Sequence, residues 1–251
     1  KTERNTNIKL SAGFSFDVYE YDSSKGALKK EKAGTLTWNG TYFTNNFPLY
    51  YTVSNQGLFG VFETTTDSAH SQGSKWAGEV RVTEKKPDAY VTAPNDPNPS
   101  SVRVYKSSSN TGQGLPGAYY GVYKDQACTQ MVVKTGPTDN TGYATTEQFQ
   151  RTQTTYWVKE IQSPMYYRLS KEVKPVTVPA GGVGSVSFQN EPMQYKLKVV
   201  KTCSETNERL EGAVYGIYSS SSCNDLSLIT KIGPTDKNGE AVSGLINYEP
   251  N

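Results

Sequence analysis

A lysine, a glutamate and an asparagine recur at matching positions along this chain. Asn95 and Asn190 are 95 residues apart, and a lysine follows each of them after eleven residues, at Lys106 and Lys201. Glu160 precedes Asn190 by 30 residues. A neutral amine is a nucleophile, a carboxyl group can pass protons, and an amide carbonyl reacts when a proton donor polarises it. Side chains of these three types could therefore exchange one amide bond for another if the fold buried them together.

The same residues also have a plain structural interpretation. Lys106 and Glu160 could form an exposed ion pair on neighbouring strands, worth about a few tenths of a kcal/mol. Asn190 could then be an ordinary turn residue. The two interpretations differ in whether the three side chains are buried.

The remaining sequence offers little for other chemistry. A single histidine, His70, argues against most metal sites and catalytic triads. The three cysteines fit neither a zinc-ligand spacing nor a disulfide scaffold. Hydrolase motifs such as GxSxG and HExxH do not occur in the sequence. We therefore expect no metal, no cofactor and no substrate that is turned over.

Charge and hydropathy narrow the choice of partners. The 26 lysines and arginines nearly balance the 24 aspartates and glutamates and are scattered along the chain, so we expect no nucleic acid partner. No apolar run approaches the ~20 residues that span a bilayer, so we expect no membrane span in this segment. The chain begins and ends abruptly, which we interpret as a fragment of a longer polypeptide whose targeting signals lie elsewhere.

An internal repeat organises the chain. LPGAYYGVY at 115–123 aligns with LEGAVYGIY at 210–218, and GPTDNTG aligns with GPTDKNG after a short insertion. The first part of the chain repeats more loosely. There SAGFSFDVY corresponds to LPGAYYGVY, and LFGVFE, ending at Glu63, corresponds to TTYWVKE, ending at Glu160.

This repeat predicts three modules: module one, residues 1–97, module two, 98–193, and module three, 194–251, which lacks the segments that end the other two. Segments such as VRVYK, TTYWVKE and SVSFQ alternate β-branched or aromatic residues with polar ones, and Gly, Pro, Asn and Asp separate them. Short strands at this spacing predict an all-β fold of tandem immunoglobulin-like β-sandwiches. TDNTG and TDKNG are predicted to be hairpin turns in which Asp bonds to nearby backbone.

The two whole modules resemble the CnaB (SpaA-type, prealbumin-like) domains of Gram-positive pilins and collagen-adhesin stalks. The shared features are the lysine that ends the first strand, the GAxYGVY strand, the TDxxG turn, the YWVKE strand and the terminal FQNEP. The resemblance is clear over residues 100–251 and looser over 1–97. In that family the Lys and Asn side chains join covalently, which implies an isopeptide bond between Lys106 and Asn190, promoted by the acid Glu160.

Burial explains why this chemistry would need these residue types. Desolvation lowers the pKa of a lysine, which leaves it neutral and nucleophilic, and raises the pKa of a glutamic acid, which can then stay protonated. The acid can donate to the amide oxygen, stabilise the tetrahedral oxyanion and pass a proton to departing ammonia. Folding supplies the proximity, so each module would react once, as self-maturation and not as enzymatic turnover.

By the same resemblance, module one would join Asn95 to a lysine near the start of the sequence, with Glu63 as the promoting acid. Lys1 is the favoured nucleophile, because KTERNTN echoes the KTCSETN segment of module three, and Lys9 is the alternative. Module three contains only Lys201, whose partner we expect outside the visible chain.

These features favour a structural stalk or shaft segment of a bacterial cell-surface adhesin or pilus-like fibre, extracellular and either anchored to the cell wall or built into a fibre. Its partners would be the neighbouring modules of the same polypeptide. The alternative is an adhesin module that recognises a host protein or glycan, chiefly through module one, whose loop at 64–76 is long and divergent.

Overall fold

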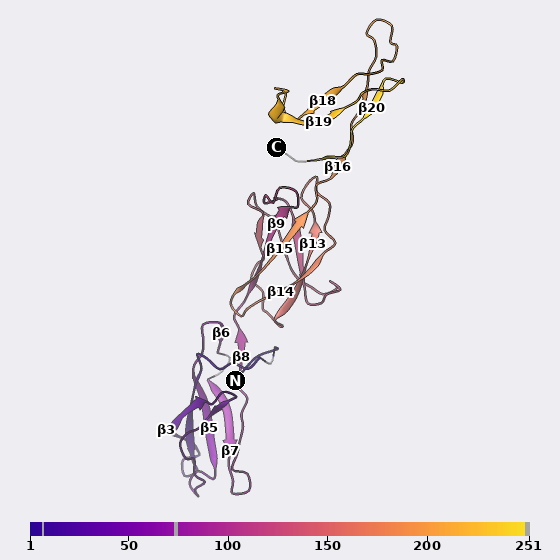
Figure 1. Cartoon of the computed structure of the whole chain (residues 1–251). Coiled ribbons are helices and arrows are strands. Elements are labelled where there is room, and N and C mark those ends of the chain that lie inside the picture. The colour runs from indigo at the N-terminus through magenta and orange to yellow at the C-terminus, as the bar shows by residue number, and fades with distance from the viewer. Residues whose placement is uncertain (7, 73–74, 249–251) are drawn as a thin grey trace.

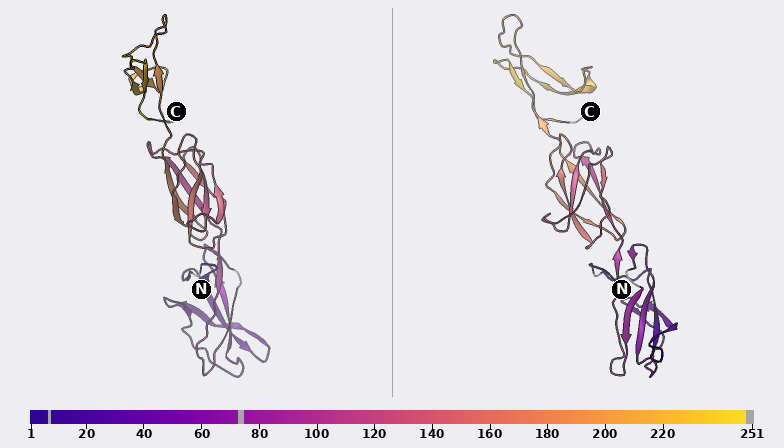
Figure 2. Two further views of the ribbon diagram at one scale, coloured as in Figure 1. Left: turned by 90° about the vertical axis from the view of Figure 1, so that its right-hand side faces the viewer. Right: turned by 180° about the vertical axis from the view of Figure 1, so that it is seen from behind.

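The protein is a row of three β-modules. The computed structural model describes residues 1–6, 8–72 and 75–248, and the modules follow one another end to end (Figure 1). Figure 2 shows the same succession from two further sides. Regular structure is almost entirely β-strand, as the alternating sequence predicts, and every sheet takes its strands from one of the ranges 1–97, 98–193 and 194–251. Over the described residues, no helix has the length and apolar character needed to cross a membrane.

Module two is a sandwich of two sheets. Its strands are β9 Ser101–Ser108, β10 Tyr119–Tyr123, β11 Met131–Thr135, β12 Tyr143–Thr145, β13 Thr155–Gln162, β14 Val173–Thr177 and β15 Val183–Asn190. One sheet has the order β11-β10-β13-β14 and the other β12-β9-β15. β9 and β15, the first and last strands, are parallel neighbours. The chain therefore enters the module at one end and leaves it at the other, which suits an end-to-end arrangement.

The core of module two lies between these two sheets. Side chains alternate in and out along each strand, and the inward ones form one buried cluster: Val102, Val104, Ala118, Tyr120, Val122, Tyr156, Val158, Val176, Val178 and Phe188. Each large apolar side chain buried in this way stabilises the fold by ~1.5–3 kcal/mol. On β9 and β13 the inward alternation continues one step past the valines, to Lys106 and Glu160.

Module one repeats the relation between first and last strands. Its strands are β1 Thr2–Glu3, β2 Ser15–Asp22, β3 Ala27–Trp38, β4 Phe43–Thr44, β5 Leu58–Thr65, β6 His70–Ser71, β7 Trp76–Arg81 and β8 Pro94–Pro97. They form a five-stranded sheet, β4-β3-β2-β5-β7, and a small sheet, β1-β8-β6. Phe14, Phe16, Val61 and Ala93 form the buried core. β1 and β8 are parallel, as β9 and β15 are in module two.

Module three is more open. Its strands are β16 Gln194–Tyr195, β17 Lys198–Val200, β18 Tyr215–Tyr218, β19 Leu228–Ile232, β20 Glu240–Val242 and β21 Ile246–Asn247, with a 3-10 helix at Asp225–Ser227. They pair as β16-β21, β17-β20 and β18-β19. Several large apolar side chains are exposed here, including Val214, Val242 and Leu245. The described part of this module therefore buries less apolar surface than module two.

The predicted repeat is confirmed at the level of single hydrogen bonds. Asp139 Oδ1 accepts from the backbone N–H groups two and four residues later, at 2.8 and 3.0 Å. Asp236 Oδ1 accepts from the corresponding groups at 2.8 and 2.9 Å. The TDNTG and TDKNG segments are therefore the same aspartate-stabilised turn, as predicted. The prediction that they are hairpin turns is wrong, because the strands that flank each turn, β11 and β12 or β19 and β20, belong to different sheets.

Candidate functional site

Lys106, Glu160 and Asn190 lie together in the interior of module two. Lys106 is on β9 and Asn190 ends β15, in one sheet, whereas Glu160 is on β13 in the other. Lys106 lies opposite Phe188 in the parallel register, and Asn190 is two residues further on, on the same face of its strand. Lys106 and Glu160 are fully buried, and Asn190 is 2% exposed. This burial excludes the exposed ion pair of the plain structural interpretation.

The carboxyl group of Glu160 lies between the amine and the amide. Lys106 Nζ is 3.1 Å from Glu160 Oε1, which is the distance of an ion pair. Asn190 Nδ2 donates to both carboxyl oxygens, at 2.9 Å each. One acid thus contacts both groups that an isopeptide bond would join, and it could carry a proton from one nitrogen to the other.

The surroundings of the trio favour an uncharged amine. Burial lowers the pKa of Lys106 below its usual value, and the nearby Glu160 carboxyl offsets only part of this effect. Among the described residues, neither Lys106 Nζ nor Asn190 Oδ1 has a hydrogen-bond partner of good geometry. A buried polar atom without such a partner costs about 1–3 kcal/mol. In an attack on the amide, this oxygen is the atom on which negative charge would develop.

Two residues that lie next to Glu160, Ser170 and Tyr120, were not assigned to the site by the sequence analysis. The backbone N–H of Ser170 donates to Glu160 Oε2 at 2.7 Å. Tyr120 lies opposite Glu160 in the β10-β13 register, and its ring packs 5.1 Å from that of Phe188. The pKa of Tyr120 is raised, mainly because the side chain is buried and to a smaller extent because of the nearby charge of Glu160. Strand alternation predicts that Tyr120 points inward. The contact of Ser170 could not be predicted, because almost any residue type has a backbone N–H group that can donate.

Module one contains the same arrangement. Lys1 Nζ donates to Glu63 Oε2 at 2.7 Å, and both side chains are buried. Asn95 Nδ2 donates to Glu63 Oε1 at 2.8 Å and to Thr66 Oγ1 at 2.9 Å. Asn95 is fully buried, and its Oδ1 has no hydrogen-bond partner in the part of the chain that the structure describes. Of the two lysines considered, the fold brings Lys1 to this acid and leaves Lys9 exposed.

The pKa of Lys1 is lowered, as that of Lys106 is, with burial as the largest cause. Its Nζ lies 5.2 Å from the ring centre of Phe14 and 5.8 Å from that of Phe16. The stagger of the strands also matches: Thr2 pairs with Pro94, so the register places Asn95 two residues beyond the partner of the lysine. Two modules with loosely similar sequences thus have the same lysine, acid and amide geometry.

Among the described residues of module three, neither an acid nor an amide contacts the side chain of the corresponding lysine, Lys201. The Lys201 N–H donates to Gly239 O at 2.7 Å, as the Lys106 N–H donates to Gly142 O at 2.7 Å. Lys201 is half-buried, and in the described part of the chain it makes no ion pair. Its partner therefore stays a prediction.

Comparison with known proteins identifies the type of module two. Residues 100–192 match the family model of SpaA, a prealbumin-like fold domain. A search of curated proteins finds no match. The matched range covers nearly all of module two, so this module is a SpaA-type, prealbumin-like domain, as the sequence resemblance implies.

Several solved structures are similar over much of the chain. The TIE protein of Bacillus anthracis is 19% identical, with a TM-score of 0.45, over 97% of this chain and 46% of that one. A C-terminal fragment of the pilus adhesin SpaC from Lactobacillus rhamnosus GG is 14% identical, with a TM-score of 0.29, over 76% and 95%. GBS52, a minor pilin of Streptococcus agalactiae, is 12% identical, with a TM-score of 0.30, over 72% and 83%. The chain thus spans less than half the length of the TIE protein.

Proposed function

We propose that this chain is a stalk or shaft segment of a bacterial cell-surface adhesin or pilus-like fibre, and that modules one and two each form an isopeptide bond between their first and last strands. The observation that carries the proposal is the buried lysine, glutamate and asparagine found twice with the same contacts. The SpaA-type character of module two supports it. The chain is then extracellular, and its partners are neighbouring modules.

The reaction in module two needs only the three side chains. Proton transfer from Lys106 to Glu160 gives a neutral amine and a neutral acid, the favoured pair in an apolar core. The Lys106 nitrogen attacks the side-chain carbonyl carbon of Asn190, and the carboxyl group takes a proton from the attacking nitrogen and gives one to the leaving nitrogen. One amide bond forms, one breaks, and ammonia is released. The product contains no free nucleophile, so the reaction occurs once.

A bond at this place suits a load-bearing module. β9 and β15 are the first and last strands of module two, and a link between Lys106 and Asn190 would transmit tension directly from one to the other. It would also close a loop of ~85 residues, which the chain-entropy treatment of crosslinks values at about 4–5 kcal/mol. The shaft would resist both stretching and local unfolding.

A binding role for module one is the second candidate, and a cavity in this module favours it. The cavity has a volume of about 270 Å³, and the apolar side chains of Val18, Leu36 and Val61 line it. Tyr42 and Tyr90 also line it, although 47% and 78% of their surfaces are exposed. Binding of the chain to a panel of matrix proteins and glycans, compared with its Tyr90→Ala variant, tests this role. Equal binding or no binding by both proteins contradicts it.

The first experiment is the intact mass of the denatured, reduced chain. We expect a deficit of one ammonia for each reacted module, and hence one ammonia fewer lost in Glu160→Ala and in Asn190→Ala. Glu191→Ala is the matched control, because Glu191 is an exposed acid next to Asn190. The full theoretical mass for the unmodified chain would refute the isopeptide proposal.

A further inference from the structure

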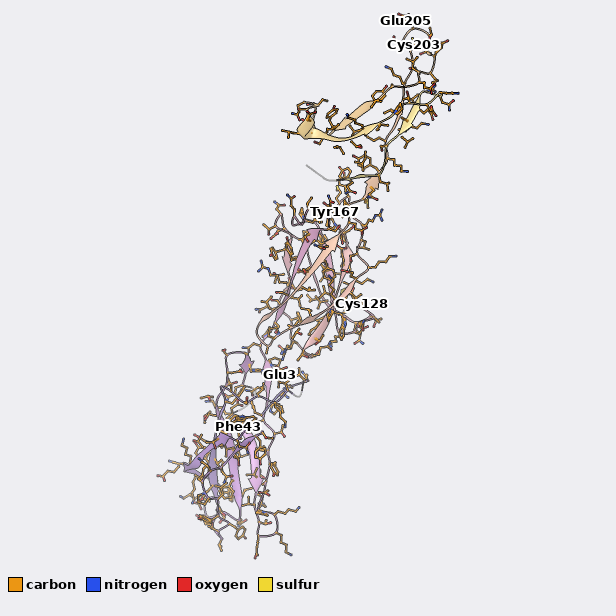
Figure 3. All side chains as sticks on the ribbon, in the orientation of Figure 1. Glu3, Phe43, Cys128, Tyr167, Cys203 and Glu205 are labelled. Carbon is orange, nitrogen blue, oxygen red and sulfur yellow. The ribbon has the colours of Figure 1, made fainter. Side chains whose placement is uncertain are left out.

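Arg151 of module two reaches into module one. Its guanidinium forms an ion pair with Glu3 and donates to the carbonyl of Val178. Arg151 is 4% exposed and Glu3 1% exposed, although they are 148 residues apart in sequence. Figure 3 shows Glu3 at the end of module one that faces module two. This buried pair therefore joins two modules rather than two strands of one module.

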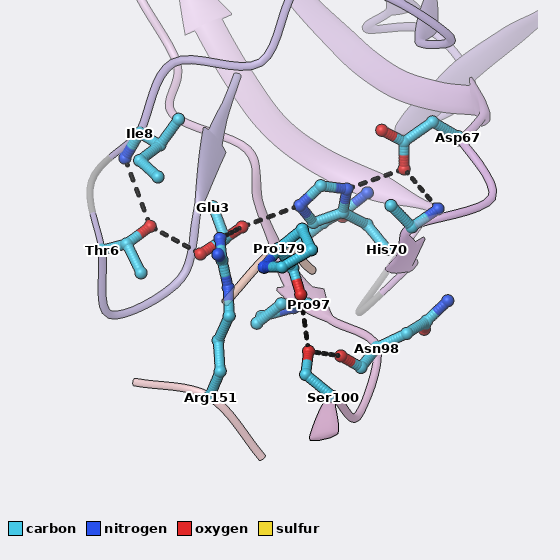
Figure 4. A network of polar contacts seen from close by, with 12 residues as sticks. Glu3, Thr6, Ile8, Asp67, His70, Pro97, Asn98, Ser100, Arg151 and Pro179 are labelled. Carbon is cyan, nitrogen blue, oxygen red and sulfur yellow. Dashed lines mark hydrogen bonds and ion pairs between the residues drawn. The ribbon is translucent and has the colours of Figure 1, made fainter. Parts of the chain in front are cut away.

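Glu3 is also the end of a chain of contacts inside module one (Figure 4). Thr6 Oγ1 donates to its Oε1 at 2.7 Å. His70 Nε2 lies 3.0 Å from its Oε2, the same oxygen that Arg151 contacts. The other ring nitrogen, His70 Nδ1, lies 2.7 Å from Asp67 Oδ1. The imidazole is thus held between two carboxyl groups, and His70 is only 7% exposed.

The protonation state of the His70 ring decides whether its two nitrogens attract or repel the carboxyl oxygens of Glu3 and Asp67. A neutral imidazole has one N–H, so one of its nitrogens would direct a lone pair at a carboxylate oxygen. The doubly protonated ring donates to Glu3 and Asp67 together. With that ring, the cluster has two anions and two cations, since Arg151 is always charged. Loss of the proton from His70 leaves an excess negative charge at the joint.

Glu3 itself stays ionised in this process. Burial alone would raise the pKa of Glu3, but hydrogen bonds from Thr6, His70 and Arg151 outweigh it and hold the pKa below its usual value. Lys1 is a further charged group near this cluster, since the charge of Asp67 acts on it. Arg4 and Asp96 form a separate, half-exposed pair. Glu3 and Arg151 therefore both stay charged, and the contacts of the cluster depend on how many protons the His70 ring carries between its two carboxyl partners.

The loop that carries Asp67 and His70 also holds the linker between the modules. The Asn98 N–H donates to Ala69 O at 2.9 Å, and Asn98 Nδ2 donates to Ser68 O at 2.9 Å. On the side of module two, the Gly181 N–H donates to Asn98 O at 3.0 Å. Movement of this loop would therefore change the orientation of the linker.

We infer that Glu3, Asp67, His70 and Arg151 form a proton-dependent lock between modules one and two. The lock holds the modules in one orientation while His70 is doubly protonated. It loosens when the ring loses a proton, because one carboxylate then faces a lone pair. A fibre built of such segments would be stiffer in mildly acidic surroundings than in alkaline ones.

NMR of the whole chain tests this lock. His70 is the single histidine of the sequence, so its ring signals need no assignment. We expect ring ¹⁵N shifts of the doubly protonated form at about pH 5 and of the neutral form at about pH 9, on either side of the ordinary range of a histidine. Backbone ¹⁵N relaxation should give modules one and two a common tumbling time at the lower pH and different times at the higher pH.

Variants separate the lock from general stability. His70→Gln and Arg151→Gln should each give different tumbling times at both pH values. Arg4→Gln, which removes the half-exposed pair formed by the residue next to Glu3 in sequence, should behave as the unmodified chain. Unchanged amide shifts in the core of module two would show that the variants are folded.

Three outcomes would overturn the inference: a neutral ring at both pH values, a ring that titrates while the tumbling times stay equal, or a pH response that survives in His70→Gln. The titration of the unmodified chain decides the first two even if a variant does not fold. None of these outcomes depends on isopeptide formation, which the mass measurement tests separately.

Discussion

Modules two and three have the same backbone frame around a lysine but differ in what surrounds its side chain. The frame is local: in both modules the lysine N–H bonds to the glycine of the TDxxG turn. The acid and the amide of module two are distant in sequence, since Glu160 and Asn190 follow Lys106 by 54 and 84 residues. The comparison teaches that a short motif can prepare the lysine, whereas the reactive site needs strands from the far end of the module.

The largest effect should come from removing the module-two nucleophile. Lys106→Met keeps an apolar stem in the core but cannot form the bond. We expect the free energy of unfolding of module two to fall by about 4–5 kcal/mol, the value of the lost crosslink. A urea titration read from the amide signals of module two measures this change. Lys174→Met, at a partly exposed lysine on β14, is the control and should leave the transition in place.

Much of the module-two site could be predicted from sequence because it follows strand alternation. Lys106, Glu160 and Asn190 each continue a run of inward apolar residues, so a period of two places them in the core. The choice between Lys1 and Lys9 could not be made in this way. It depends on the pairing of β1 with β8, which are more than 90 residues apart.

The joint between the modules could not be predicted at all. Glu3 and Arg151 belong to different modules, and no repeated motif relates one to the other. Contacts between modules depend on the orientation of whole domains, which a local pattern does not encode. Thr66 and Ser170 lie in loops and could not be predicted for a similar reason. Their contacts with the two sites depend on loop conformation and not on residue spacing.

The next prediction concerns the nucleophile of module one. Lys1→Ala should retain one ammonia that the unmodified chain loses, because its amine lies 2.7 Å from Glu63. Lys9→Ala should keep the mass deficit of the unmodified chain, because Lys9 is exposed. Intact mass of the two variants, prepared side by side, decides between them. A retained ammonia in Lys9→Ala would show that the comparison of modules one and two assigns the wrong lysine.

A smaller, pH-dependent effect is expected when the amide is removed. Asn190→Ala cannot form the bond, so Lys106 remains an amine whose pKa in the folded protein is lowered by burial. Between that value and the ordinary lysine pKa of about 10.4, the unfolded chain binds more protons than the folded one. The free energy of unfolding should therefore rise with pH in this window, by at most about 1.4 kcal/mol per pH unit.

Urea transitions of module two in Asn190→Ala at a series of alkaline pH values measure this slope. The double variant with Lys106→Met lacks the titrating amine and should have a flatter profile. Equal slopes in the two proteins would mean that Lys106 does not titrate in this window, and that its burial does not prepare it for attack.

The smallest effect should be at Lys201. This lysine has the same backbone bonds as Lys106, but its side chain is half-buried and makes no ion pair within the described residues. Lys201→Ala should therefore change the free energy of unfolding of this chain by no more than about 0.5 kcal/mol, as substitutions outside a packed site do. Its mass should differ from that of the unmodified chain by the substitution alone. A larger loss of stability, or a retained ammonia, would mean that Lys201 already has an acid and an amide beside it.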